Sequence, residues 1–516
     1  MIRDAWAFAG RFLCRNTSLT SGAWAEDSTA NTPGQKIQAV ACGAGHSLIL
    51  LDDGTVWGCG ANEYGQLGDG TGANHRLPVK IPQLTDITGV ACGPYFSLAV
   101  KKDGTVWGWG SNEDGLLGTG NTPVQIPGLK NIIDIACGGN QALALKKDGT
   151  VWAWGSNRFG QLGDGTYQDR KIPFQIKGLK KIKAIACGSR HTVAVSTDGT
   201  LWVWGANGSG QLGDGTRTAR LRPFLLPGVE DIAGVACGSD YTVALKKDGN
   251  VISWGANGSG QLGDGTKTEK IRPVRVAGLE EVISIASGTN FNLALKKDGS
   301  LWGWGSDSFG ELGDGKAVES VDKCIPCGGK NNIYYYDKPR PVPVTEGTQV
   351  AFIACGASHA MMVKADGAIW SWGLNNYGQL AEGSVVERPI PVPNFFGRIV
   401  GKMALQYQNI TAEQAKARLE RERDILLLDV RRPDEYQVKH LRNSILIPVD
   451  ELEKEAETRI PDKNTPVLVY CKSGARSARA AGLLVKLGYQ NVSNILGGIG
   501  SWPDETVDSE QGTVDG

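Results

Sequence analysis

Residues 41–71 read "ACGAGHSLILLDDGTVWGCGANEYGQLGDGT", and this stretch decides the fold because it recurs along the chain. It returns from residue 91 as "ACGPYFSLAVKKDGTVWGWGSNEDGLLGTG" and then five more times. A repeat of this length is typical of propellers and solenoids, in which each unit is one small structural module. One position marks the seven units: Cys42, Cys92, Cys137, Cys187, Cys237, Ser287 and Cys355.

Each unit carries the pattern of about four short antiparallel strands. "SLILLDDGTVWGCG" predicts two strands joined by Asp-Gly, a pair that favours a two-residue hairpin turn. "KIQAVACG" predicts a strand before this hairpin, and "RLPVKIP" predicts another after it. Four antiparallel strands make one propeller blade, so the seven units predict an all-β seven-bladed β-propeller over residues 35–397.

Tryptophan and cysteine occupy fixed positions within the units. The tryptophans form two columns two residues apart, which places both rings on one face of a strand, and we interpret them as packing between blades. Six of the eleven cysteines share the marker position, which suits small buried residues, so disulfides are not expected there. The columns are Trp57, Trp107, Trp152, Trp202, Trp302, Trp370 and Trp109, Trp154, Trp204, Trp254, Trp304, Trp372.

The pattern "ACG..HSLAL..DGTVWGWG.N..GQLGDGT" resembles the repeats of the regulator of chromosome condensation (RCC1-like) family over residues 36–397. The resemblance implies a seven-bladed propeller, a fold shared by guanine-nucleotide exchange factors, inhibitor-like binding proteins and a plant ultraviolet photoreceptor. "GSRHT" (188–192) is similar to the photoreceptor signature but has Ser189 where that protein has its sensing tryptophan. No residue identifies a small-GTPase contact, and near-identical repeats are commoner in bacterial propellers, so nucleotide exchange is the weaker alternative to a protein-binding scaffold.

Two columns of polar residues have a structural and a metal-binding interpretation. His46, His191 and His359 share a column with aromatic residues and a glutamine, which favours a semi-buried packing position over metal ligation. An acidic column lies in the "GQLGDG"-type loops, where ordinary turn chemistry explains it better than calcium. We therefore predict no metal or other cofactor. The acids are Asp69, Asp164, Asp214, Asp264, Asp314 and Glu382.

The sixth unit contains an insertion at about residues 316–345, which includes "KAVESVDKCIPCGGKNNIYYYDKPR". Cys324 and Cys327 form a single C-x-x-C motif, which could bind metal, form a local disulfide or stay as two free thiols. Tyr334, Tyr335 and Tyr336 supply contact area at low entropic cost and are the candidate partner-binding residues of the propeller.

A second domain begins near residue 400, where the Gly/Trp rhythm stops. We expect a linker at 398–404, an α/β domain with a parallel sheet at 405–504, and an acidic tail at 505–516. "ITAEQAKARLERERD" opens with the capping-box pair Thr411 and Gln414. Buried strands are predicted at 425–431 and 467–470, and a helix at 475–489.

Cys471 stands apart from the other cysteines because it follows the strand of 467–470 and precedes the helix. Ligands bind at the carboxyl ends of such strands, and a helix amino terminus favours an anion there. Lys472 and Arg476 add positive charge. All three influences favour the thiolate, so the sequence predicts a lowered thiol pKa and a nucleophilic cysteine.

"DVRRPDEYQVKHL", "YCKSGARSARAA" and "LGGIGSW" together resemble a single-domain rhodanese, a sulfurtransferase, over about residues 405–503. The resemblance implies that Cys471 takes a sulfane sulfur from thiosulfate or another small anionic donor and passes it to a thiol or cyanide acceptor. Lys472, Ser473, Gly474, Ala475 and Arg476 would bind the donor and the persulfide. It also implies structural or supporting roles for Asp429, Arg431, Glu435 and His440.

The six-residue span from Cys471 to Arg476 matches the sulfur-transferring branch of this family, since the phosphatase-like branch has one residue more. Lys439 and the pair Arg442-Asn443 depart from the family pattern, which has glycine and Pro-Gly there. The alternative function is that of an interaction protein in which both domains only bind.

Composition restricts the partners and the compartment. Lys and Arg number 54, as do Asp and Glu, and no basic block suggests nucleic acid. No apolar run is long enough to predict a membrane span. We expect residues 1–34 to form a loose tail and the protein to be cytoplasmic, with export as the alternative because of Ala23-Trp24-Ala25.

Overall fold

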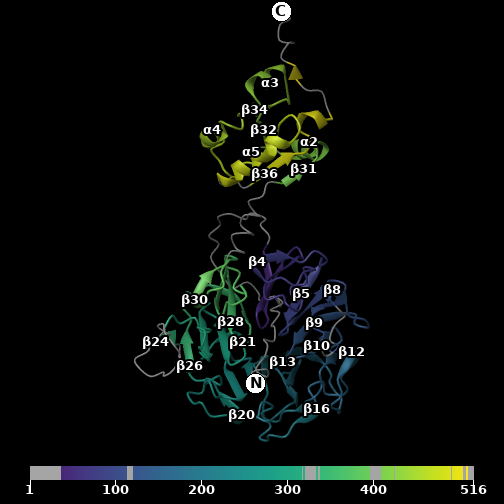
Figure 1. Cartoon of the computed structure of the whole chain (residues 1–516), viewed down its shortest axis with the longest axis vertical. Coiled ribbons are helices and arrows are strands. Elements are labelled where there is room, and N and C mark those ends of the chain that lie inside the picture. Colours follow the sequence, from purple (N-terminus) through teal and green to yellow (C-terminus); the bar gives the residue numbers. More distant parts are fainter. Residues whose placement is uncertain are drawn as a thin grey trace, which may run out of the picture. The chain divides into compact units, whose positions relative to one another are not determined.

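A computed structural model of the chain describes residues 36–112, 115, 120–316, 337–394, 408–422, 425–487, 489 and 491–503, with short strand pairs at 318–319, 333–334 and 507–508. The described residues form two compact units, one up to residue 394 and one from residue 408 (Figure 1). Tyr334 belongs to one of the short strands, whereas Tyr335, Tyr336, Cys324 and Cys327 lie outside the described residues.

The first unit contains seven four-stranded antiparallel sheets, which confirms the predicted seven-bladed propeller. The first four blades are β1 (Ile37–Cys42), β2 (His46–Leu51), β3 (Val56–Gly60), β4 (His75–Lys80); β5 (Ile87–Cys92), β6 (Phe96–Lys101), β7 (Val106–Gly110), β8 (Gly120–Gln125); β9 (Ile132–Cys137), β10 (Gln141–Lys146), β11 (Val151–Gly155), β12 (Arg170–Gln175); and β13 (Ile182–Cys187), β14 (His191–Ser196), β15 (Leu201–Gly205), β16 (Arg220–Leu225).

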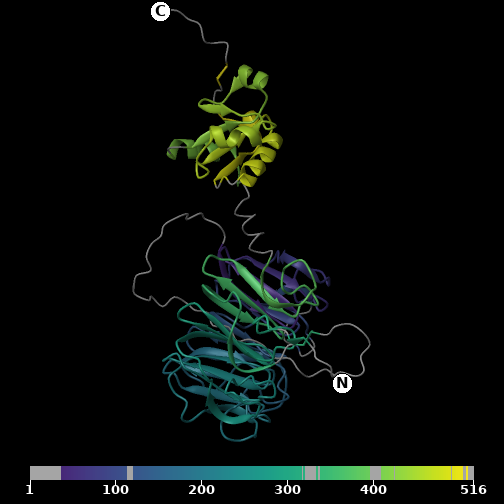
Figure 2. The ribbon, with the colours of Figure 1, turned by 90° about the vertical axis from the view of Figure 1, so that its left-hand side faces the viewer.

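The last three blades are β17 (Ile232–Cys237), β18 (Tyr241–Lys246), β19 (Val251–Gly255), β20 (Lys270–Arg275); β21 (Val282–Ser287), β22 (Phe291–Lys296), β23 (Leu301–Gly305), β26 (Lys338–Pro343); and β27 (Val350–Cys355), β28 (His359–Lys364), β29 (Ile369–Gly373), β30 (Arg388–Pro393). The short pair β24 (Val318–Glu319) and β25 (Ile333–Tyr334) belongs to the insertion between β23 and β26. The first strands of neighbouring blades contact one another around the ring, and β1 contacts β27, so blade one closes against blade seven (Figures 1 and 2).

The hairpin between the second and third strands differs from the two-residue turn predicted for Asp-Gly. In blade one, Gly54 N–H donates to Leu51 O, and Leu51 N–H donates to Thr55 O. This pattern encloses three residues, 52–54, and ends at Gly54 with a φ of +78°. The Asp53 carboxylate accepts the Thr55 N–H at 2.9 Å, so the aspartate stabilises the turn through its side chain.

Neighbouring blades are joined through one backbone carbonyl in the glycine-rich loop. Gln66 O of blade one accepts Trp109 Nε1–H at 2.8 Å and Ser97 Oγ–H at 2.9 Å, both from blade two. The same arrangement recurs at Gln161, Gln211 and Gln261. At the closure, Gln379 O accepts Ser47 Oγ–H at 2.9 Å. The second tryptophan column is therefore buried and bonded between blades, in agreement with the packing role predicted for it.

The histidine column is fully buried, and the prediction of a semi-buried position was wrong. His46, His191 and His359 are 0% exposed. Each Nε2 lies 2.9 or 3.0 Å from a hydroxyl of the next blade, and Ser47 is the partner of His359. Burial lowers the pKa of all three to about 3, so the imidazoles are neutral. The column is buried because it fills the seam between blades.

The second unit is a small α/β domain with five parallel strands in the order β31-β36-β35-β32-β34, as predicted. Its strands are β31 (Gln408–Ile410), β32 (Leu426–Asp429), β33 (Lys439–His440), β34 (Ser444–Leu446), β35 (Val467–Tyr470), β36 (Val492–Ile495) and β37 (Val507–Asp508). Its helices are α2 (Ala412–Arg421), α3 (Pro433–Val438), α4 (Leu452–Arg459), α5 (Ala475–Lys486) and the short 3-10 helix η1 (Gly498–Ser501).

Local signals set most of these bounds. Thr411 and Gln414 form the predicted capping box of α2. Helix α5 is shorter than the predicted helix at 475–489: it ends at Lys486, and Tyr489 instead packs into the core with its hydroxyl donating to Ala456 O at 2.7 Å. No helix of the described chain is long and apolar enough to cross a membrane.

Ring closure predicts that Ser47→Ala and Ser97→Ala destabilise the propeller equally. Each hydroxyl donates to a buried carbonyl of the preceding blade and meets a histidine Nε2 at 2.9 Å, Ser47 at the closing seam and Ser97 at an internal one. Losing these bonds should cost about 1–3 kcal/mol. Denaturant unfolding followed by tryptophan fluorescence measures both, and a negligible effect of Ser47→Ala beside a large effect of Ser97→Ala would show that the ring is open in solution.

Candidate functional site

Cys471 lies in the turn between the central strand β35 and helix α5. The strand ends at Tyr470 and the helix begins at Ala475, so the turn has four residues. Gly474 is the N-cap of α5 with a φ of +102°, a conformation that favours glycine because it has no Cβ. Cys471 is only 1% exposed, so its side chain contacts protein atoms and almost no solvent.

Two donors approach the sulfur. Gly474 N–H donates to Cys471 Sγ at 3.1 Å, and Ser477 Oγ, in the first turn of α5, lies 3.5 Å from it. Ser477 Oγ also lies 3.1 Å from Gly474 O. Ser477 is a site residue that the sequence analysis missed, although its place six residues after the cysteine, at the start of the predicted helix, was a signal for it.

These donors favour the thiolate. Burial raises the pKa of the Cys471 thiol. The Ser477 hydroxyl and the backbone N–H groups of Ser477, Ser473 and Gly474 together lower it by more than burial raises it, so the pKa lies below the ordinary thiol value. A thiolate that accepts several N–H and O–H bonds at a helix amino terminus is a reactive nucleophile. The turn is therefore suited to nucleophilic sulfur chemistry.

A second glycine loop clamps the cysteine turn. Ile499 N–H donates to Cys471 O at 2.8 Å, and Gly500 N–H donates to Lys472 O at 3.3 Å. A Cβ at Gly498 would lie 2.2 Å from Cys471 O, so only glycine permits this approach. The block "LGGIGSW" thus has a defined role: it fixes the backbone from which Cys471 projects.

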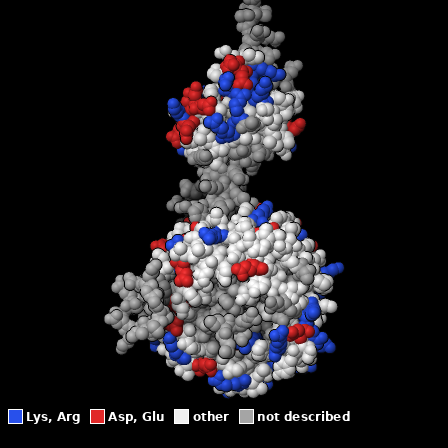
Figure 3. Space-filling model, in the orientation of Figure 1, with Lys and Arg blue, Asp and Glu red and all other residues white. Residues whose placement is uncertain are grey.

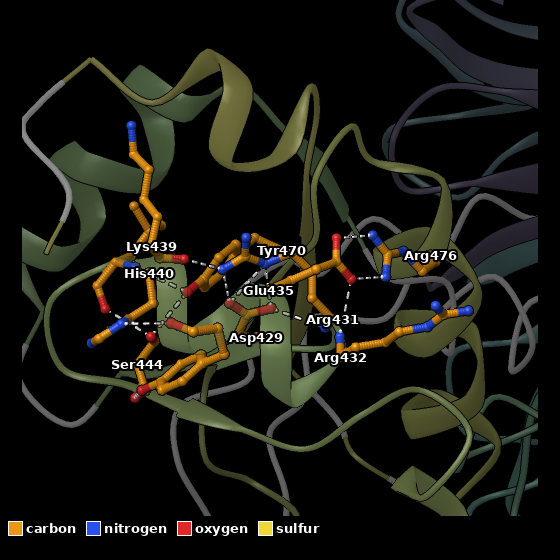
Figure 4. Close-up of polar contacts among 11 residues, drawn as sticks. Asp429, Arg431, Arg432, Glu435, Lys439, His440, Ser444, Tyr470 and Arg476 are labelled. Atoms are coloured by element: carbon orange, nitrogen blue, oxygen red, sulfur yellow. Dashed lines mark hydrogen bonds and ion pairs between the residues drawn. The ribbon is translucent and has the colours of Figure 1, made fainter. Parts of the chain in front are cut away.

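Arg476 is not a free cation, as Figure 4 shows. Its guanidinium makes two bonds to the Glu435 carboxylate, at 2.6 and 2.8 Å, and Arg432 N–H donates to the same carboxylate at 3.2 Å. The hydrogen bond from Arg476 holds the pKa of Glu435 at about 2, so the carboxylate stays ionised at neutral pH. Lys472, in contrast, is exposed and forms no ion pair with the described part of the chain.

Asp429 and Arg431 form a buried pair beside the site (Figure 4). The closest approach is 2.6 Å, with exposed side-chain fractions of 0% and 6%. Arg431 also donates to Lys439 O at 2.6 Å. Tyr470, the residue before the cysteine, donates its hydroxyl to Ser444 at 2.9 Å. This network ties the end of β32 to the segment that follows α3.

His440 lies in that segment and contacts Tyr436. Its ring stacks on the tyrosine with centroids 4.2 Å apart, and its Nδ1 lies 3.0 Å from Tyr436 O. Asn443, which replaces a family glycine, has a φ of +64°. Asparagine tolerates this left-handed conformation better than most residues, so the substitution preserves the turn.

Elsewhere the acidic column is engaged in its own loops. Asp69, for example, accepts the Thr71 N–H at 2.9 Å and the Asn62 amide at 3.0 Å, which agrees with the turn chemistry predicted for it. Among the described residues, no three or more His, Cys, Asp or Glu side chains gather as a metal site. Lys, Arg, Asp and Glu all appear on the visible face of both units (Figure 3).

Comparison with known proteins gives the family of the propeller. The RCC1-like domain family model matches residues 15–280, which is more than half of the chain. The chain belongs to the RCC1-like family. Single RCC1 repeats match further at 282–311 and 350–379, and at 298–363 and 366–404. The crystal structure of Prp20p from Saccharomyces cerevisiae, described with its binding to Gsp1p and histones, superposes with a TM-score of 0.57 and 26% identity, over 67% of this chain and 87% of that one.

The second unit of this RCC1-like protein is a rhodanese-like domain, which matches that family model over residues 411–505. The chain is 41% identical to the thiosulfate sulfurtransferase PspE of Escherichia coli over 70 residues, which is 14% of this chain and 67% of PspE. It is 37% identical to the thiosulfate sulfurtransferase GlpE of Coxiella burnetii over 84 residues, 16% of this chain and 77% of GlpE.

Ser477→Ala should raise the pKa of the Cys471 thiol, because it removes the hydroxyl nearest the sulfur. Ser473→Ala should leave it close to that of the wild type, because Ser473 acts through its backbone N–H. Ultraviolet thiolate absorbance against pH, minus that of Cys471→Ser, measures the midpoint. The buried repeat cysteines do not interfere, since burial raises the pKa of Cys42 and Cys187, for example, to about 12. Equal midpoints for Ser477→Ala and the wild type would contradict this account.

Proposed function

We propose that this protein is a rhodanese-type sulfurtransferase that carries sulfane sulfur on Cys471, with the propeller as a scaffold that binds a protein. One observation carries the proposal: the Cys471 sulfur accepts bonds from a helix-start amide and from Ser477, which hold its pKa below the ordinary thiol value despite burial. The similarity to thiosulfate sulfurtransferases over this domain supports it.

The proposed reaction has two displacements at sulfur. The Cys471 thiolate attacks the outer sulfur of thiosulfate, a new S–S bond forms, and the old S–S bond breaks with its electron pair leaving on sulfite. The persulfide then carries the negative charge, which the donors around Cys471 Sγ are placed to stabilise. In the second step a thiolate or cyanide attacks the outer sulfur and releases the Cys471 thiolate. No cofactor is required.

The positive charges near the turn would attract the anionic donor. Lys472 is exposed directly beside Cys471, and the charge of Arg476 interacts with that of the Cys471 thiolate. Glu435 acts as a positioning residue in this scheme, because its two bonds orient Arg476. Because Arg476 and Glu435 together carry almost no net charge, Lys472 supplies the larger share of the long-range attraction for the donor.

Incubation of the full chain with thiosulfate should give a Cys471 persulfide. Intact-mass analysis should show an adduct of one sulfur atom on the wild type and none on Cys471→Ser, and addition of cyanide should remove the adduct and give thiocyanate. An unmodified wild type would contradict the sulfurtransferase proposal and favour the alternative in which both domains only bind.

Arg476→Ala should weaken the use of donor more than it weakens folding. Loss of a charged group at the donor site should lower kcat/KM for thiosulfate about tenfold or more, whereas a partly exposed ion pair contributes about 0–1 kcal/mol to stability. Arg479→Ala is the matched control, since Arg479 is one helical turn further along α5 and, among the described residues, pairs with the exposed Asp450. Steady-state kinetics and thermal melts separate the two effects, and equal kinetic losses in both variants would exclude a specific role for Arg476.

For the propeller, we propose that residues 316–340 contact the protein partner, because they interrupt an otherwise regular ring with three consecutive tyrosines. A full chain in which Tyr334, Tyr335 and Tyr336 are all replaced by serine should lose partners that the wild type retains in a pull-down from its native lysate. Thiosulfate turnover should be unchanged, and unfolding of the propeller followed by tryptophan fluorescence serves as the folding control. Identical partner sets would place recognition elsewhere on the ring.

A further inference from the structure

Blade six departs from the other blades at two buried positions of the glycine-rich loop. The other six blades have asparagine at the first position, Asn62, Asn112, Asn157, Asn207, Asn257 and Asn375, whereas blade six has Asp307. The second position is glutamine in five of these six blades, leucine in blade two and Glu311 in blade six. Asp307 is 0% exposed and Glu311 is 2% exposed. Two amides are thus replaced by two acids without a gain in solvent contact.

The other blades show what the amide does. In the five blades that also have the glutamine, the asparagine Oδ1 accepts the N–H of a leucine five residues on, and its Nδ2 donates to a carboxylate seven residues on. In blade five, Asn257 Nδ2 lies 3.3 Å from Asp264 Oδ1 and 3.0 Å from Thr266 O. The nitrogen is therefore surrounded by acceptor oxygens.

Asp307 keeps the first bond and cannot make the second as a carboxylate. Its Oδ1 accepts Leu312 N–H at 3.0 Å, so the side chain has the orientation of the asparagines. Its Oδ2 therefore takes the place of the amide nitrogen and faces Asp314, the carboxylate seven residues on. Asp307 Oδ2 and Asp314 Oδ2 are both buried, and neither has a hydrogen-bond partner among the described residues. A carboxylate oxygen that meets another carboxylate in place of an N–H donor needs a shared proton or a cation.

The groups around the pair do not remove this need. Lys338 Nζ lies 3.5 Å from Asp314 Oδ2 and supplies one positive charge. Asp337 is already paired with Lys267 at 2.8 Å, and Glu311 adds a further acid. Asp314 Oδ1 accepts Lys316 N–H at 2.9 Å. Asp314 and Lys316 lie before residues 317–336, and Asp337 and Lys338 lie after them, so the cluster joins the two ends of the insertion.

We propose that Asp307 and Asp314 share one proton, and that its loss loosens the base of the insertion, which makes blade six a pH-sensitive element of the propeller. With the proton bound, Asp307 Oδ2–H donates to Asp314 as the asparagine amide does in the other blades. When the pH rises, the proton goes to solvent and two buried carboxylates repel each other beside a single lysine.

The expected direction follows from burial. Burial raises the pKa of Asp307 from 3.8 to about 7, and Asp314 adds to this. Burial likewise raises the pKa of Glu311 from 4.5 to about 8. At a pH between the ordinary and the raised pKa of each acid, the native loop keeps the proton, whereas the opened loop has released it. Loop stability should therefore fall as the pH rises from about 4 to about 7 for Asp307, and on to about 8 for Glu311, and then become constant.

Hydrogen exchange of the full chain between pH 5 and 8 tests the proposal on the peptide that covers residues 305–316. After correction for intrinsic exchange, protection in the wild type should fall by up to about tenfold per pH unit for each of the two protons. Asp307→Asn should remove the part of this pH dependence that ends near pH 7. Asp307→Asn with Glu311→Gln should also remove the part that extends to about pH 8. The equivalent peptide of blade five, 255–266, has both amides and is the internal control.

Two outcomes would overturn the proposal. The same pH dependence in the wild type and Asp307→Asn would show that Asp307 holds no proton in this range. Protection of the wild-type peptide at pH 8 that depends on added calcium or magnesium, and disappears with chelator, would show that the two oxygens hold a metal ion. Both variants restore the residues of the other blades, so they are expected to fold.

Discussion

A backbone carbonyl in the glycine-rich loop, described in six of the seven blades, makes the interaction on which the propeller depends. At Gln66 it accepts both a tryptophan N–H and a serine hydroxyl from the next blade, and at Gln379 it accepts Ser47 and so closes the ring. Because the acceptor is backbone, the side chain at this position can vary without loss of the joint. Glu311 shows this, since its carbonyl still accepts Trp372 Nε1–H at 2.7 Å although its side chain is an acid. The ring can therefore tolerate an unusual blade six.

The same principle, backbone geometry held by glycine, organises the cysteine site. Gly474 takes a φ of +102° and directs its N–H at the sulfur, and Gly498 allows a second loop to bond the carbonyl of Cys471. The side chains of Glu435, Asp429 and Arg431 then fix the neighbouring segments through charge. The donors to the sulfur come from residues 473–477, and two further stretches of chain, around Glu435 and Gly498, hold this turn and Arg476 in place.

Much of this arrangement could be predicted from sequence, because its determinants are local. The repeat specified blades and strands, and β35 at 467–470, the capping box at Thr411 and the turn at Cys471 were found where predicted. The missed features depend on contacts between distant segments. The burial of His46 is set by the next blade, the end of α5 is set by the packing of Tyr489 against α4, and the pairing of Arg476 with Glu435 joins residues 41 positions apart. Hairpin geometry failed for another reason: Asp-Gly suits more than one turn, and the aspartate side chain stabilised the longer one.

The cysteines show why burial alone does not decide reactivity. Cys42 and Cys471 are both nearly inaccessible, 3% and 1% exposed, yet burial raises the pKa of Cys42 to about 12, whereas the pKa of Cys471 is lowered. Cys42 receives one weak bond, from the Ser47 hydroxyl at 3.9 Å, which does not offset its burial. Cys471 loses the same solvation but gains a hydroxyl and several amides at a helix start. The difference between an inert packing thiol and a nucleophile in this chain is therefore the number of donors that replace water.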